Sequence, residues 1–133
     1  MKFEDWVQRY ESRAEKWNTG EGYHLFFDEE KGILDYAIAD DDGERAFIIG
    51  NCSTKDMAFF YRWCKKKATE QECSAIYTST MRNPAAYIRK AYSFGARPHL
   101  DLKRSGYKKG RFYWIFTERI DNETETEKSN VSV

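Results

Sequence analysis

The first residues that could do chemistry lie between a strand-like run and an amphipathic helix, at residues 51–56. Ser53 or Thr54 can cap that helix, with Asp56 in its first turn. The unpaired amides of a helix N-terminus attract anions, so the amides around Ser53 to Lys55 could hold a phosphate. An ordinary capped helix is the alternative, and the Asp56 carboxylate favours it because it would repel a bound pyrophosphate.

Other residues could move protons or attack a substrate. Glu44, Asp35 and His24 lie on strand-like runs and are candidate proton acceptors for an amine, and no second feature singles one out. His24 and His99 are also typical of half-buried strand positions. Cys52 could be a nucleophile, but no His–Asp motif accompanies it, so we do not assign it that role.

Two further stretches concentrate charge. The run Asp40–Asp42 precedes a glycine and could bind a divalent cation, but the remaining ligands of a calcium loop are missing. We therefore interpret it as a solvated turn and predict no metal site. The basic run Arg104–Arg111 could grip phosphate or a nucleic acid backbone, although charged loops are usually just solvated.

The chain has 133 residues, which suits one domain. We expect residues 1–120 to form it and residues 121–133, which lack a core-forming face, to be a flexible polar tail. Aromatic residues make up 17% of the chain and supply apolar surface for a core. The absence of a long apolar run or a signal-peptide pattern favours a cytoplasmic protein with no membrane partner, and the three cysteines should be reduced thiols.

The net charge of zero hides a segregation of charge along the chain. Residues 1–50 hold 6 Lys or Arg and 13 Asp or Glu, a balance of −7. Residues 51–120 hold 15 and 5, a balance of +10, and residues 121–133 hold 1 and 4, a balance of −3. The basic part could meet phosphate, nucleic acid or an acidic protein. We favour the alternative that it complements the acidic part within one fold.

The spacing of apolar residues predicts the elements that must position these groups. In chain order they are an amphipathic helix over 3–17, strands over 23–28, 33–39 and 44–50, a helix from Ser53 or Thr54 that fades near Gln71, a strand over 74–80, a helix begun by Asn83, and a final hairpin of strands 99–103 and 111–120. Glycine-containing turns between the first three strands indicate an antiparallel meander.

Residues 74–97 have the clearest local signals. A short strand rich in β-branched and aromatic residues comes first. Asn83 then stands at an N-cap position and Pro84 in the first helical turn, where its missing N–H does no harm. Gly95 fits a left-handed C-terminal cap, and Pro98 prevents the helix from continuing. The unit is a strand, a loop and a helix with a defined end.

Together these elements predict an α+β fold, in which a mixed, mostly antiparallel sheet carries helices on both faces. In this order of elements, over nearly all of residues 1–120, the chain resembles the GNAT acetyltransferase superfamily. The most specific part is the helix that begins with Asn83-x-x-Ala86 and closes on an aromatic residue and Gly95, similar to the family's N-x-x-A-x-x-x-Y-x-x-x-G pattern. The cofactor loop is degenerate, because after Gly50 it lacks the family's second glycine.

The resemblance implies that the strand ending near residue 50 and the strand beginning near residue 74 separate, with acetyl-CoA in the gap. Pantetheine would pair with the edge of 47–50, and the pyrophosphate would sit on the following helix start. The implied cofactor-binding residues are Ile49, Gly50, Ser53, Thr54, Lys55 and Asn83. The family's tyrosine, which protonates the departing thiolate, corresponds to Ala91, and the neighbouring Tyr92 is the implied catalytic residue.

Two functions of different classes follow from this resemblance. The first is an acetyl-CoA-dependent N-acetyltransferase that acts on an amine acceptor. The second is a non-catalytic GNAT-like phage protein, a virion component or a binder of a host or viral protein, because the chain is also similar to small phage-encoded GNAT-like proteins. Nucleic-acid binding is a weaker third reading, since no recognised module accompanies the basic residues.

Overall fold

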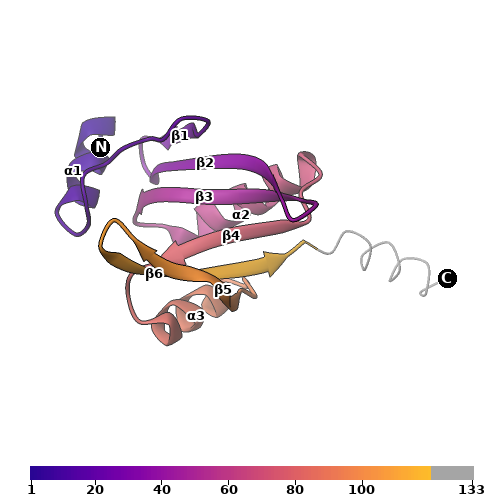
Figure 1. Ribbon diagram of the computed structural model, residues 1–133. Coiled ribbons are helices and arrows are strands. Elements are labelled where there is room, and N and C mark those ends of the chain that lie inside the picture. The colour runs from indigo at the N-terminus through magenta and orange to yellow at the C-terminus, as the bar shows by residue number, and fades with distance from the viewer. Residues whose placement is uncertain (121–133) are drawn as a thin grey trace.

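The computed structural model describes residues 1–120 of the chain, and the predicted polar tail at 121–133 lies outside the described residues. Figure 1 shows the arrangement of the elements. In chain order they are α1 (Phe3–Glu11), β1 (His24–Asp28), β2 (Gly32–Asp41), β3 (Glu44–Thr54), α2 (Met57–Glu70), β4 (Ala75–Thr80), α3 (Pro84–Ser93), β5 (His99–Lys108) and β6 (Arg111–Arg119). Among the helices of residues 1–120, none is long and apolar enough to cross a membrane.

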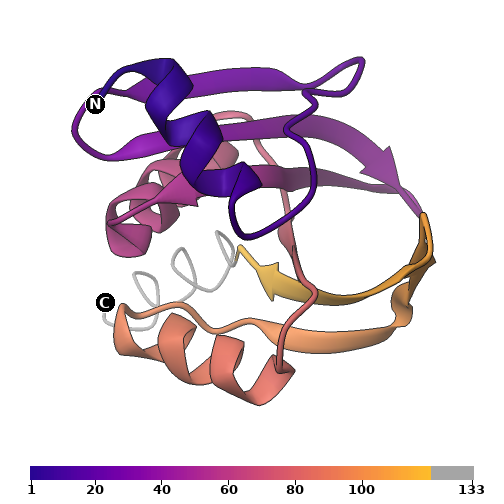
Figure 2. The ribbon, with the colours of Figure 1, turned by 90° about the vertical axis from the view of Figure 1, so that its left-hand side faces the viewer.

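The strands form one six-stranded sheet in the order β1-β2-β3-β4-β6-β5. All neighbouring strands are antiparallel except β3 and β4, which are parallel and joined through α2. This confirms the predicted α+β class with a mixed, mostly antiparallel sheet. In Figure 2, β2 and β3 diverge from β5 and β6, with α1 beside the first pair and α3 beside the second.

Helices cover both faces of the sheet, as predicted. Neighbouring residues of a strand point to opposite faces. On β1, Phe26 stacks on Trp63 of α2 with ring centroids 4.0 Å apart, and Phe27 meets Phe3 of α1 at 5.7 Å. Helices α1 and α2 therefore lie on opposite faces.

The main core lies between α2 and the sheet. The apolar stripe of α2 buries three side chains, Phe60, Cys64 and Ala68. Within this core they pack with Leu34 of β2, Phe47 of β3 and Ile76 of β4. Cys73, just before β4, and Ile120, just after β6, complete the cluster. Burying each large side chain contributes roughly 1.5–3 kcal/mol, so this contact is what fixes α2 across β3 and β4.

The first helix is shorter than predicted. It ends at Glu11 rather than near residue 17, and Ser12 is its C-cap. The Glu11 carboxylate accepts a hydrogen bond from the Trp17 amide at 2.8 Å, and the Trp17 ring packs on Tyr10 at 4.9 Å. The apolar spacing predicted six more helical residues. Instead the chain turns after Glu11, and this turn brings the Trp17 side chain back onto the helix.

The second helix also begins later than predicted. Strand β3 continues to Thr54, where it still pairs with Gly32, and the N-cap of α2 is Asp56 rather than Ser53 or Thr54. Gly32 makes this pairing possible: its φ is +135°, and a Cβ there would lie 2.0 Å from the Ser53 carbonyl oxygen. The close approach of β2 keeps residues 53 and 54 extended.

The final hairpin has a tight turn instead of a basic loop. Strands β5 and β6 are joined at Lys109 and Gly110, whose φ angles of 52° and 78° match the primed turns that suit two-residue hairpins. The register shifts between Asp101 and Gly106, so Arg104 lies in a bulge of β5. The predicted basic loop from Arg104 to Arg111 is therefore mostly strand, and the Arg104 side chain points toward Asp41 and Asp42 at the turn between β2 and β3.

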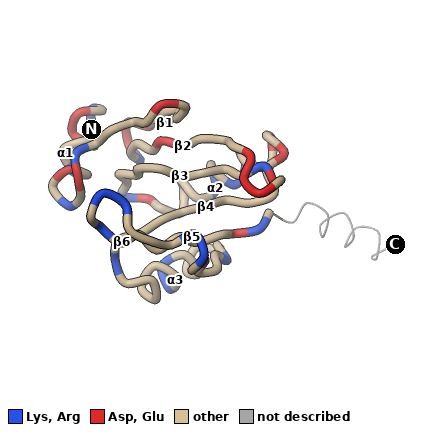
Figure 3. The backbone as a smooth tube through the Cα atoms, viewed as in Figure 1, with Lys and Arg blue, Asp and Glu red and all other residues tan. Residues whose placement is uncertain are grey.

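Arg104 joins the two oppositely charged parts of the chain. Its guanidinium lies 2.7 Å from Asp41, 2.8 Å from Asp101 and 3.4 Å from Asp42. Asp41 also accepts a hydrogen bond from the Tyr77 hydroxyl at 2.7 Å. The aspartate run at 40–42 thus meets an arginine. Figure 3 shows acidic residues gathered on the N-terminal strands and basic ones on the later elements.

The contacts around Arg104 lower the pKa of two carboxyl groups. Hydrogen bonds from Tyr77 and then from Arg104 lower the pKa of Asp41. Burial alone would raise the pKa of Asp101, but its hydrogen bonds from Arg104 outweigh burial and lower it. A carboxyl group whose pKa falls on folding stabilises the fold above its unfolded pKa, and this contribution is lost as the pH falls through the folded pKa.

Replacing Arg104 by alanine is expected to lower the free energy of unfolding more at pH 7 than at pH 3. At pH 7 Asp41 and Asp101 are ionised and lose their partner, whereas pH 3 lies below the unfolded pKa of an aspartate (about 3.9), where protonation of the unfolded chain has already reduced what the pairs contribute to stability. Urea unfolding at the two pH values measures the difference. The matched control is Lys103→Ala, which removes an exposed neighbouring cation. Equal losses at both pH values for Arg104→Ala would contradict this account.

Candidate functional site

The parallel strands β3 and β4 pair over only three residues and then separate. The paired residues run from Ala46 with Ala75 to Ile48 with Tyr77. Beyond them β3 stays bonded to β2 as far as Thr54, and β4 stays bonded to β6 as far as Thr80. The predicted separation is therefore present, but it begins after Ile48, so Phe47 and Ile48 are still paired and do not form a free edge.

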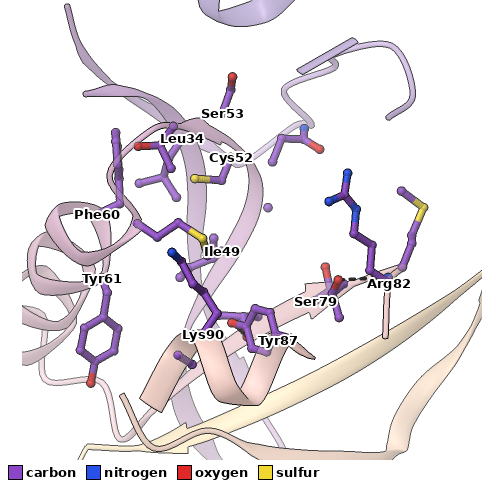
Figure 4. A pocket seen from close by; sticks show the side chains of 18 of the residues that line it. Leu34, Ile49, Cys52, Ser53, Phe60, Tyr61, Ser79, Arg82, Tyr87 and Lys90 are labelled. Atoms are coloured by element: carbon purple, nitrogen blue, oxygen red, sulfur yellow. Dashed lines mark hydrogen bonds between the residues drawn. The ribbon is translucent and has the colours of Figure 1, made fainter. Parts of the chain in front are cut away.

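A cavity of about 550 Å³ occupies the space between the separated strands, α2 and α3, and reaches the side of α1. Figure 4 shows how side chains from these elements surround it. Its inner wall is largely apolar and includes Leu34, Ile49, Cys52, Phe60 and Ala91. Polar groups from the end of β4 and from α3 face it too, among them Thr78 and Tyr87. A cavity of this size and mixed lining suits an organic ligand.

Five of the six residues implied to bind a cofactor line this cavity. Four of them belong to β3, and Asn83 caps α3, its side-chain oxygen accepting from the Ala85 amide at 2.9 Å. The four are Ile49, Gly50, Ser53 and Thr54. Lys55 is not part of the lining, and its ammonium lies 5.9 Å from the centre of the Trp6 ring.

The N-terminus of α2 is already occupied by protein groups. Asp56 accepts from the Phe59 amide at 3.0 Å and pairs with Lys31 at 3.0 Å. The Lys55 amide donates to the Lys31 carbonyl at 3.4 Å, and the Thr54 hydroxyl donates to the same carbonyl at 2.6 Å. The hydrogen bond from the Phe59 amide and the nearby Lys31 lower the pKa of Asp56, which keeps it ionised. An anion at these amides would meet a carboxylate.

Tyr92 is not brought to the cavity. It is absent from the lining, its side chain is 44% exposed, and the Arg97 guanidinium lies 4.8 Å from its ring. Ala91 lines the cavity instead, as the rotation of about 100° between neighbouring helical residues requires.

Tyr87 is a tyrosine of α3 that does line the cavity. Its ring stacks on Phe116 with centroids 4.4 Å apart, and its hydroxyl donates to the Thr78 hydroxyl at 2.6 Å. Burial raises the pKa of Tyr87, so this hydroxyl keeps its proton at neutral pH. Figure 4 shows it between α3 and the end of β4.

Cys52 also lines the cavity, on the side of β3 that faces α2. Burial, together with the negative charge of Asp35, raises the pKa of its thiol to about 12. A thiol with this pKa stays protonated at neutral pH, and only the thiolate is strongly nucleophilic. The surroundings of Cys52 therefore disfavour nucleophilic catalysis.

Of the three candidate proton acceptors, Asp35 lies beside a cavity. Glu44 pairs with Arg119 at the far end of β3, and His24 is an exposed residue of β1 whose ring contacts Tyr36. Asp35 lines a second cavity of about 540 Å³. Both cavities are lined by Ile49, Gly50 and Asn51 of β3 and by Thr78 and Ser79 of β4, so they meet at the gap between the strands.

Asp35 sits in a bulge of β2 and is only 1% exposed. Its carboxylate accepts from the Asn51 amide at 2.6 Å and from the Asn51 side chain at 3.0 Å. Gly50 permits this contact, because a Cβ there would lie 2.0 Å from the Asp35 carboxylate. Burial raises the pKa of Asp35 although the hydrogen bonds from Asn51 oppose it, so it is a stronger base than an exposed aspartate.

Sequence reasoning offered Asp35 as one candidate among three and did not consider Tyr87. One signal could have singled out Asp35: it is the one carboxylate within the otherwise apolar run at 33–39. A charged residue in such a run must be buried with partners or mark a bulge. No comparable signal marked Tyr87, because a tyrosine on the apolar face of a helix is typical of a core position.

Comparison with known proteins supports the fold. No family model and no curated protein matches the chain. Among solved structures, a chain of the crystal structure of the NatC complex bound to Gag peptide and CoA has a TM-score of 0.58 at 10% identity, covering 89% of this chain and 90% of that one. A GNAT family acetyltransferase from Listeria monocytogenes has a TM-score of 0.46 at 11% identity, covering 74% and 64%. The likeness to the NatC chain, with its TM-score above 0.5, shows a shared fold and agrees with the GNAT-like fold predicted from the sequence.

Replacing Asp35 by asparagine is expected to lower the free energy of unfolding at pH 7 by about 1–3 kcal/mol, the cost of leaving a buried donor unpaired. The new amide group would face the Asn51 side-chain amide, and two donors would then oppose each other. Urea unfolding measures the change. Asp40→Asn, an exposed change on the same strand, is the control and should alter stability little. Unchanged stability of Asp35→Asn would mean that this contact does not hold the bulge.

Proposed function

We propose that this chain binds acetyl-CoA between β3 and β4 and transfers its acetyl group to an amine. The observation that carries the proposal is the separation of two parallel strands after Ile48 and Tyr77, with a cavity between them. The CoA in the NatC structure, a protein of similar fold, supports the choice of ligand. At 10% identity that structure shares the fold alone, and the residues of this chain support the ligand and the chemistry.

The lining of the cavity fits such a cofactor. The apolar side chains Leu34, Ile49 and Phe60 suit the pantetheine arm, and backbone groups of β3 beyond Ile48 no longer bond to β4. Basic residues line the same cavity and suit phosphate groups. As the resemblance implies, Ile49 and Gly50 would hold the arm, and Asn83 is a further cofactor-binding residue.

The chemistry needs two proton transfers, one from the amine to the protein and one from the protein to the leaving sulfur. Acetyl-CoA, when bound, supplies the thioester carbonyl that an amine attacks. Asp35, at the second cavity, would accept a proton from the amine directly or through water, which its raised pKa favours. Tyr87, at the first cavity, would donate a proton to the leaving sulfur. This assigns to Tyr87 the role that the resemblance implied for Tyr92.

A binding protein without turnover is the second candidate. The exposed position of Tyr92, with Ala91 facing the cavity in its place, favours it, because the family's proton donor is then missing from its usual position. Such a protein would bind a protein partner. Binding of CoA without acetyl transfer would agree with this second candidate.

Acetyl-CoA at 100 times its Kd is expected to stabilise the folded chain by about 2.7 kcal/mol, seen as a rise in Tm. Replacing Ala86 by tryptophan should abolish the rise, because this exposed residue of α3 lines the cavity and the indole would fill it. Ala85→Trp is the matched control on the exposed neighbouring position, outside the lining. The proposal fails if millimolar acetyl-CoA leaves the Tm of the unmodified chain unchanged.

Tyr87→Phe is expected to lower kcat for acetyl transfer about 100-fold, the usual size of a lost proton donor, with unchanged affinity for CoA. Tyr92→Phe should leave kcat unchanged, because Tyr92 lies outside the cavity. Steady-state assays with an amine acceptor, combined with Tm values to confirm folding, provide the comparison. A loss of kcat in Tyr92→Phe alone would restore the assignment implied by the resemblance.

A further inference from the structure

Four cationic side chains line the first cavity, and none of them has a side-chain partner within residues 1–120. They are Arg9 on α1, Arg13 just after it, Arg82 after β4 and Lys90 on α3. None takes part in an ion pair, and their side chains make no hydrogen bond to the described protein. In contrast, Lys31 and Arg104 both pair with carboxylates nearby.

The acidic residues of the same lining do not neutralise these cations. Glu15 accepts a hydrogen bond from the Tyr113 hydroxyl at 2.9 Å. Glu118 is buried and accepts from the Tyr61 hydroxyl and, at 2.9 Å, from the Arg97 amide. Four cations against two carboxylates leave the lining with an excess of positive charge, which attracts anions.

The cations come from separate elements that converge on one space. Figure 4 shows Lys90 extending from α3 toward β3 and α2, and Arg82 beyond Ser79 on the other side of the cavity. Arg9 and Arg13 approach from α1, on the opposite side of β3. Cations that face one cavity from several sides attract an anion placed between them.

We infer that Arg9, Arg13, Arg82 and Lys90 form the binding site for the phosphate groups of a nucleotide-containing ligand, in place of the backbone amides at the start of α2. The amides of Lys55 and Phe59 and the Thr54 hydroxyl bond to the protein itself, and the ionised Asp56 stands among them. This inference rests on the proposed function, in which the ligand is acetyl-CoA. It adds the side chains that would hold the phosphate groups of that ligand.

The test is calorimetric titration of the full chain with CoA, with 3′,5′-ADP, which carries phosphates but no thiol arm, and with pantetheine, which carries the arm but no phosphate. Arg82→Ala and Lys90→Ala should each weaken CoA and 3′,5′-ADP binding about tenfold and leave pantetheine binding unchanged. Added salt should weaken CoA binding by the unmodified chain more than CoA binding by a variant that carries both Arg82→Ala and Lys90→Ala. The control is Arg89→Ala, which removes an exposed cation beside Lys90 that is absent from the lining.

The outcomes separate the two claims. If the unmodified chain binds CoA and the Arg82 and Lys90 variants bind it equally well, the inference is overturned and the proposed function stands. If the chain binds 3′,5′-ADP through these cations and fails to respond to acetyl-CoA, the phosphate site is supported and the acetyl-transfer proposal fails. Binding of neither ligand by the unmodified chain would overturn both.

Discussion

The short parallel contact between β3 and β4 is the constraint on which the rest of the molecule depends. Three residue pairs, ending at Ile48 and Tyr77, hold the two strands together at one end. Each strand is then fixed on its outer side, β3 by β2 and β4 by β6, as far as Thr54 and Thr80. The gap therefore leaves the hydrogen bonds of β3 to β2 and of β4 to β6 intact. The sheet stays continuous while its two central strands separate.

Side chains on both sides keep the gap from closing. On β3, the bulge at Asp35 and the small Gly50 place Asn51 against a buried carboxylate, which draws this strand toward β2. On β4, the Tyr87 hydroxyl holds Thr78 and so draws the strand toward α3. Each contact ties its strand to an element other than the opposite strand. The groups that we propose to move protons are thus also groups that shape the site.

Local signals made much of this fold predictable. Asn83, Pro84 and Gly95 bound α3 as expected, because each acts through its own backbone conformation or hydrogen bonds to near neighbours. The order of strands and helices followed from apolar spacing in the same way. The boundaries that differ were set by distant residues, as when Gly32 keeps β3 extended through Thr54 or when Trp17 folds back on Tyr10. Spacing along the chain carries no information on such contacts.

The candidate site was less predictable than the fold for the same reason. Whether Tyr87 or Tyr92 faces the gap depends on the rotation of α3 against the sheet, which is set by the stacking of Tyr87 on Phe116. Two cations of the cavity come from α1 and the turn after it, and two from the loop after β4 and from α3, so the two pairs are far apart in sequence. The charge count found the basic excess of the later residues, but it could not find where Arg82 and Lys90 meet the two arginines of the acidic part.

The most direct test of the account is a set of backbone NOEs across β3 and β4, measured by NMR on the isotope-labelled chain. The account predicts interstrand NOEs that link Phe47 with Ile76 and Ile48 with Tyr77, and none that link Gly50 to Ser79. A continuous series of NOEs extending to Thr80 would mean that the strands pair to their ends, and a ligand could not then lie between them.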